Sequence, residues 1–178
     1  DSRILETLKL ESKQYIVLTL HRPSNVETIE VFKPILEVIK QLSKEFKVVF
    51  SVHPRTREKI KEFNLEYITQ PFIRIGPLPY LDMIRLMSHS KLVMTDSGGI
   101  QEETTILGVP CVTIRENTER PITVEKGTNR LGGIKRDSLL MAFKSIIESG
   151  GKDRGVPDLW DGKTAERIVK IILSWVKD

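Results

Sequence analysis

The segment Asp96-Ser97-Gly98-Gly99 joins a run of apolar residues to a stretch with helical spacing. Ser97 is of a type that caps helices, and two consecutive glycines let a ligand approach the backbone closely. The free N–H groups and the positive dipole end of a helix start favour anions by about 0.3–1 kcal/mol per charge, or ~2 kcal/mol where the site is partly buried. The segment therefore predicts a site for a diphosphate, without indicating which molecule carries it.

Two common phosphate-binding signatures do not fit this segment. Gly-x-Gly-x-x-Gly is absent and no Gly-Lys-Ser/Thr follows, which disfavours hydride transfer with a dinucleotide and hydrolysis of ATP. Glu103 follows Ser97 closely enough to reach past the phosphates and accept hydrogen bonds from both hydroxyls of a ribose. Glu102 and Glu103 fit equally well as helix-favouring acids near a helix start, so spacing alone leaves both interpretations open.

Polar and charged residues also follow the other apolar runs, as His21-Arg22, His53-Pro54-Arg55 and Arg115-Glu116. In open α/β sheets, ligands bind outside the carboxyl ends of the strands. We therefore expect these residues to share one site with the segment that starts at Asp96. We expect no metal there, because the three histidines lack ligand spacing and no thiol cluster accompanies them; His89, late in a helical stretch, is predicted to be structural.

Short apolar runs alternate with helical patterns along the chain. The predicted strands cover residues 15–20, 47–52, 73–75, 91–95 and 110–114. A loop is predicted at 21–27, and the predicted helices cover 32–42, 56–63, 80–89, 98–107, 137–148 and 161–175. Strands that are apolar almost throughout are covered on both faces. The alternation therefore predicts an α/β fold with a doubly wound, Rossmann-like parallel sheet.

The composition fits one soluble domain with a substantial core. The chain has 178 residues, of which 39% are hydrophobic and 29% charged. Because the first residue is Asp1 and not Met, we expect a processed chain or a piece of a longer one with a missing half. No apolar run is long enough to span a membrane and no signal-like leader opens the chain, so we expect a cytoplasmic protein without a membrane partner.

Charge and cysteine content exclude further classes. The net charge is +4, but the lysines lie on separate predicted helix faces and no aromatic stacking motif lies between them, so no nucleic-acid partner is expected. A single cysteine cannot form an internal disulfide or supply a metal-binding set. Cys111 lies in the apolar run 109–114 and is predicted to be a buried strand residue.

Several motifs together resemble one enzyme family. They are Thr95-Asp96-Ser97-Gly98-Gly99-Ile100-Gln101-Glu102-Glu103, then Gly108-Val109-Pro110, then Thr118-Glu119-Arg120-Pro121. In order and spacing this set is similar to the non-hydrolysing UDP-N-acetylglucosamine 2-epimerases. Further matching positions are His21-Arg22, His53-Pro54 and Tyr80-Leu81. The resemblance extends from about Tyr15 to Ala165-Glu166-Arg167-Ile168.

The resemblance implies a two-domain architecture of the glycosyltransferase-B type, of which this chain is the second, UDP-holding domain. Residues 1–178 would form that single domain, with 1–14 leading into it and 158–178 holding a terminal helix that packs on the missing N-terminal domain. The full-length enzyme would be a homodimer. It would interconvert UDP-N-acetylglucosamine and UDP-N-acetylmannosamine without a cofactor, by eliminating UDP to leave 2-acetamidoglucal and adding it back.

The resemblance also assigns roles to single residues. Ser97, Gly98 and Gly99 would bind the diphosphate and Glu103 the ribose. His21 and Arg120 would bind phosphate or act in the reacting region as catalytic residues. Arg22 and His53 are candidates for an effector-binding or supporting role. The family's main proton-transfer carboxylates belong to the domain that this chain does not contain.

This sequence departs from the bacterial pattern at three places: Leu78 replaces a polar residue that contacts the ligand, Met83 replaces an aromatic residue, and the loop from His21 to Val26 lacks the His-Arg-Arg-Glu form. Three other interpretations stay open. One is the donor-binding half of a glycosyltransferase, whose loop usually reads His-Gly-Gly. The second is a hydrolysing UDP-N-acetylglucosamine 2-epimerase. The third is a nucleotide-binding module without catalytic activity.

Overall fold

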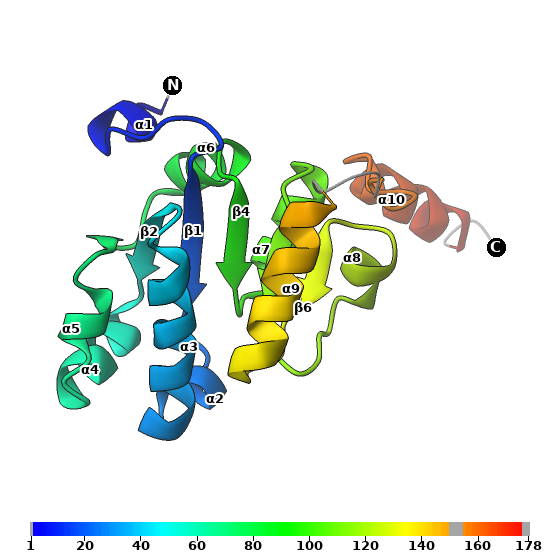
Figure 1. Cartoon of the computed structure of the whole chain (residues 1–178). Helices are drawn as coiled ribbons and strands as arrows, with labels where there is room; N and C mark the ends of the chain where they lie inside the picture. The colour runs from blue at the N-terminus through cyan, green and yellow to red at the C-terminus, as the bar shows by residue number, and fades with distance from the viewer. Residues whose placement is uncertain (1, 150–154, 176–178) are drawn as a thin grey trace.

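A computed structural model describes residues 2–149 and 155–175 of the chain (Figure 1). Its centre is one six-stranded, all-parallel sheet in the order β3-β2-β1-β4-β5-β6. The strands are β1 (Tyr15–Leu20), β2 (Lys47–Val52), β3 (Ile73–Ile75), β4 (Leu92–Thr95), β5 (Cys111–Thr113) and β6 (Asn129–Leu131). The prediction of a doubly wound, Rossmann-like parallel sheet is confirmed.

The strand order reverses between β1 and β4, because β2 and β3 extend the sheet on one side of β1, and β5 and β6 on the other. The register pairs Leu20 with Val52 and Thr19 with Thr95, so the carboxyl ends of β1, β2 and β4 lie at the same edge. Such a reversal opens a crevice at that edge, where ligands of doubly wound folds bind. The residues that follow these three strands therefore meet there.

Helices cover both faces of the sheet. α3 (Ile29–Leu42) and α9 (Arg136–Glu148) lie on one face, in front of the sheet in Figure 1, with α6 (Tyr80–Ser88) and α7 (Gly98–Ile106) behind it. The remaining helices are α1 (Ile4–Thr7), α2 (Pro23–Val26), α4 (Pro54–Glu62), α5 (Glu66–Thr69), α8 (Pro121–Glu125) and α10 (Thr164–Trp175). This arrangement explains the nearly continuous apolar strands, since a strand covered on both faces has no solvent side.

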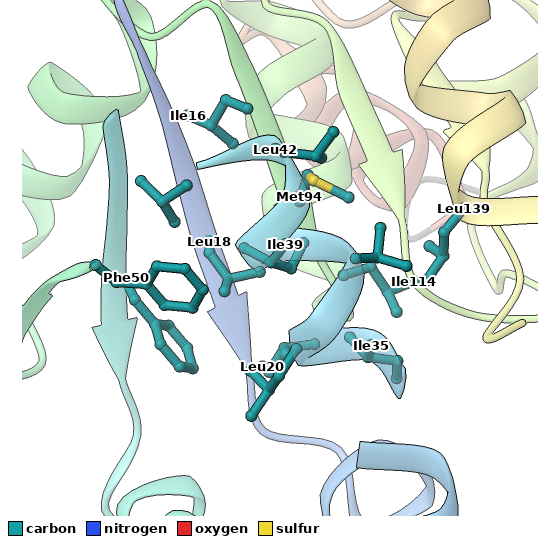
Figure 2. Close-up of a cluster of buried hydrophobic side chains, with 14 of the residues drawn as sticks. Ile16, Leu18, Leu20, Ile35, Ile39, Leu42, Phe50, Met94, Ile114 and Leu139 are labelled. Carbon is teal, nitrogen blue, oxygen red and sulfur yellow. The ribbon is translucent and has the colours of Figure 1, made fainter. Parts of the chain in front are cut away.

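The core divides into two clusters, one on each face of the sheet. The larger joins β1 to α3 and reaches α9 through Leu139. Figure 2 shows Leu18 of β1 beside Ile39 of α3, with Ile114 toward Leu139. The smaller joins the opposite side of β1, through Tyr15 and other residues, to α6 and α1. Cys111 is buried in β5, as predicted. Among the described residues, none of the helices is long and apolar enough to cross a membrane.

The structure corrects several predicted boundaries. The predicted loop 21–27 contains α2, which starts at Pro23 because proline suits the first turn of a helix. α5, α8 and β6 were not predicted, because each has only three to five residues and is too short to show a periodicity. The last helix begins at Thr164 and not at Asp161.

Candidate functional site

Asp96 follows β4 at the point where the strand order reverses, and its carboxylate is fully buried. It accepts hydrogen bonds from the backbone N–H groups of His21 (3.0 Å) and Arg22 (2.9 Å), which follow β1. The Nδ1 of His21 lies 2.8 Å from Asp96 Oδ1, and Asn25 in α2 donates to Asp96 Oδ2 at 3.1 Å. One carboxylate thus ties the two central strand ends together and orients the imidazole.

These contacts also determine the ionisation of Asp96. Burial by itself raises the pKa of the carboxyl, but the hydrogen bonds from the His21 side chain and from the backbone N–H groups of Arg22 and His21 outweigh it and lower the pKa below its usual value. The carboxylate is therefore charged at neutral pH. A charged Asp96 favours a proton on the facing nitrogen of His21, which leaves the other ring nitrogen to interact with a ligand.

The start of α7 has the form that the sequence predicted, with one correction. Ser97 is the N-cap residue by its extended backbone, with φ −86° and ψ 130°. Its side chain, however, makes no capping hydrogen bond within the described part of the chain, and its backbone N–H donates instead to Thr95 Oγ1 at 3.0 Å. The Ser97 hydroxyl is therefore not committed to the helix. A Cβ on Gly99 would meet open space, so a ligand can approach the backbone there.

Arginines and glutamates surround this helix start. Arg22 donates from Nε to the Asp96 carbonyl at 3.0 Å and from Nη2 to Glu119 Oε1 at 2.7 Å. Arg115 Nη1 forms a second ion pair with Glu119 Oε2. Nε of Arg120 lies 2.8 Å from Glu102 Oε1. The start of α7 is thus flanked by three guanidinium groups, each of which faces a carboxylate of the chain itself.

A buried network of amides and hydroxyls holds the loop with Glu119 and Arg120 against α7. Gln101, fully buried in α7, accepts from Thr118 Oγ1 at 2.6 Å and from Asn129 Nδ2 at 3.1 Å, and donates to the Ser97 carbonyl at 3.2 Å. Thr118 Oγ1 in turn accepts from the Arg120 backbone N–H at 2.9 Å. Asn129 also donates to Thr123 Oγ1 in α8. Because buried polar groups of this kind are costly to leave unpaired, the network fixes the position of the loop.

His21, His53 and Ser97 line one pocket of about 210 Å³ at the carboxyl edge of the sheet. The other lining residues are Thr19, Leu20, Ser51, Pro77 and Ile100. The rings of His21 and His53 lie 5.9 Å apart between centroids. The structure thus brings His21, His53 and Ser97 of the expected site to one pocket, whereas Glu116 faces the Ile134 N–H instead. That these residues bind a ligand stays a prediction.

Glu103 lines a different pocket of about 440 Å³, which is mostly apolar and is bounded by residues of α6, α7 and Trp160. It lies one helical turn beyond Ile100, which forms a wall of the first pocket. Partial burial, and then the charge of Glu102, raise the pKa of the Glu103 carboxyl. The structure therefore places Glu103 next to the first pocket but not inside it.

Sequence reasoning missed two residues of this arrangement. Asn25 donates to Asp96 and to the Ile114 carbonyl at 2.8 Å, and so joins α2 to both β4 and β5. Glu119 pairs with two arginines, although the sequence showed it only as part of a motif with Arg120. The sequence signal that could have singled out Glu119 was its position directly before Arg120. In residues 2–149 and 155–175, no group of three or more His, Cys, Asp or Glu side chains is arranged to hold a metal ion.

Comparisons with known proteins assign the chain to a family. The family described as UDP-N-acetylglucosamine 2-epimerase matches residues 1–173. A relative from Methanocaldococcus jannaschii named UDP-N-acetylglucosamine 2-epimerase is 42% identical over 163 residues, which are 89% of this chain and 44% of the relative. The chain therefore spans about half the length of the curated relatives it matches.

Solved structures agree. The crystal structure of the M. jannaschii UDP-GlcNAc 2-epimerase in complex with UDP-GlcNAc and UDP superposes with a TM-score of 0.85 at 38% identity, over 98% of this chain and 49% of that one. The Neisseria meningitidis UDP-GlcNAc 2-epimerase bound to UDP-GlcNAc gives a TM-score of 0.81 at 30% identity, over 97% and 48% of the two chains. Sequence motifs, fold and comparisons agree that this chain belongs to the UDP-N-acetylglucosamine 2-epimerase family.

Proposed function

We propose that this chain is the UDP-binding half of an enzyme that interconverts UDP-N-acetylglucosamine and UDP-N-acetylmannosamine. The observation that carries the proposal is the start of α7, where backbone N–H groups at the strand reversal are flanked by Arg22, Arg115 and Arg120. Positive charge and a helix start together suit a diphosphate. The M. jannaschii and N. meningitidis relatives were solved with uridine nucleotides bound, which supports UDP as the carrier.

In this proposal Ser97, Gly98 and Gly99 hold the diphosphate. The free hydroxyl of Ser97 and the open space at Gly99 support that role. Glu103 lies one turn further along α7 and accepts hydrogen bonds from the ribose. Its raised pKa means that the accepting, ionised form is lost at a higher pH than for an ordinary glutamate.

His21 and Arg120 act on the leaving group. When the bond between the anomeric carbon and UDP breaks, negative charge develops on the diphosphate, and preorganised donors stabilise it. His21, held by Asp96, and Arg120, now paired with Glu102, are the donors at this site. His53 lines the same pocket as His21, and Arg22 donates to the Asp96 carbonyl; we assign both a supporting or effector-binding role.

Epimerisation at C2 also needs groups that remove a proton and return one to the opposite face. We assign that task to carboxylates of an N-terminal domain that completes the enzyme, and we assign the complete enzyme to a homodimer acting in the cytoplasm. This division predicts that the chain by itself binds UDP weakly and does not epimerise the sugar.

Calorimetric titration with UDP, together with an assay that follows both nucleotide sugars, tests the proposal. We expect heat from UDP binding, no interconversion by this chain, and interconversion when the upstream half is restored. Absence of heat at millimolar UDP would remove the nucleotide-binding role. Turnover by the chain alone would show that the proton-transfer groups lie in this half, and release of free N-acetylmannosamine would indicate a hydrolysing enzyme.

A further inference from the structure

The carboxylate of Glu119 lies at the start of α7. A Cβ built on Gly98 would be 2.5 Å from Glu119 Oε1, so that oxygen lies against the first residue of α7 on the side where a side chain would project. The same oxygen accepts from Arg22 at 2.7 Å, and the other oxygen pairs with Arg115. One carboxylate of the chain thus has the surroundings, a helix start and two guanidinium groups, that suit a phosphate group.

We propose that Glu119 is a built-in anion that occupies part of the diphosphate position and leaves it when a diphosphate binds. This inference rests on the proposed function, since it concerns the same site. It makes Glu119 a residue that opposes binding. A carboxylate and a phosphate cannot share Gly98 and Arg22, because two anions at van der Waals distance repel each other.

The structure allows this exchange with a movement of one side chain. Glu119 is 39% exposed, so its carboxylate can turn into solvent without leaving a buried charge behind. The backbone on both sides of Glu119 stays in place, because Thr118 before it donates to Gln101 and accepts from the N–H of Arg120 after it. Arg22 also stays in place through its bond to the Asp96 carbonyl. The guanidinium group is therefore already oriented for the incoming phosphate.

Glu119 also has a function when no ligand is bound. Arg22 and Arg115 would otherwise face each other and the positive end of α7 without a counter-ion. With Glu119 between them, one negative charge lies against both guanidinium groups and reduces their mutual repulsion. The chain therefore keeps a strongly basic site folded in the absence of ligand, and the cost is a weaker apparent affinity for every anion that must displace the carboxylate.

The test is a titration of the chain and of Glu119→Gln with inorganic pyrophosphate, UDP and uridine. Glutamine keeps the size of the side chain and removes its charge. We expect Glu119→Gln to bind pyrophosphate and UDP about threefold tighter, in line with the weight of partly exposed ion pairs, and uridine unchanged. The matched control is Glu45→Gln, an exposed residue just before β2 and so at the opposite edge of the sheet, which should leave all three affinities unchanged.

Equal or weaker pyrophosphate binding by Glu119→Gln would overturn the inference and show that Glu119 positions the arginines. If Glu119→Gln binds pyrophosphate more tightly but UDP binds no tighter than pyrophosphate, the inference holds and the proposed function is contradicted. A thermal unfolding scan of the variant verifies its fold. If it does not fold, the ¹³C resonance of the Glu119 carboxyl in the unaltered chain decides: it should shift on saturation with pyrophosphate, and an unmoved resonance overturns the inference.

Discussion

Asp96 connects the two central strands at the candidate site through bonds from His21, Arg22 and Asn25. Its pKa is lowered because these donors outweigh the effect of burial. A carboxyl with a lowered pKa stabilises the fold above its unfolded-state pKa, and that contribution is lost as pH falls through the native value. The free energy of unfolding should therefore decline in the acid range below the usual aspartate pKa.

Asp96→Asn should destabilise the chain by about 2–3 kcal/mol at neutral pH, because an amide cannot accept from every donor that the carboxylate satisfies. It should also make the free energy of unfolding fall less steeply as the pH is lowered. Urea unfolding at a series of pH values measures both effects, with Asp137→Asn on the exposed face of α9 as control. An acid decline as steep in Asp96→Asn as in the unaltered chain would show that other carboxyls cause it.

Arg120→Ala should weaken UDP binding about tenfold and uridine binding much less, because a guanidinium contributes through the phosphates. Arg130→Ala, in β6 outside the site, is the control. Titration of both variants with UDP and with uridine gives the comparison. Equal losses for UDP and uridine would place Arg120 away from the diphosphate.

At the scale of elements, the site depends on how α7 is held to the loop before α8. Gln101 is the shared partner of Ser97, Thr118 and Asn129. Gln101→Met keeps the length of the side chain but leaves these buried groups unpaired, so the free energy of unfolding should fall by about 2 kcal/mol. Chemical denaturation measures the loss, with the exposed Gln70→Met as control. Equal stability of the two variants would mean that the network is not what holds the loop.

The strands and the start of α7 could be predicted from sequence because their signals are local. Apolar runs such as 15–20 and the Ser97-Gly98-Gly99 turn are read from neighbouring residues. The short elements lack such a signal: β6 is a strand because it pairs with β5, and α8 has only five residues. The pairing of Glu119 with Arg22 joins residues 97 positions apart, which no local pattern shows.

At the scale of the whole molecule, α10 stands apart from the sheet in Figure 1 and has no buried residue. Its apolar side chains are largely exposed, with Ile168 at 51%, Ile172 at 55% and Trp175 at 80%. Such a face fits the prediction that segment 158–178, of which 176–178 lie outside the described residues, packs on an N-terminal domain. That packing stays a prediction.

A chain with this face uncovered should associate with itself, because exposed apolar patches of this kind drive association. Sedimentation equilibrium should show a mass above that of the monomer, and Ile168→Asn combined with Ile172→Asn should lower it. When the upstream half is restored, the measured mass should be the same with and without the two substitutions in α10. A monomer at all concentrations, with α10 unaltered, would show that the face needs no partner.

The central claim is that the start of α7 holds a nucleoside diphosphate, and a structure of this chain with UDP tests it most directly. We predict phosphate oxygens about 2.7–3.2 Å from the backbone nitrogens of Gly98 and Gly99, with the ribose toward Glu103. A diphosphate in the cavity beside Arg130 and Ser138, or one that points into solvent away from α7, would contradict the account.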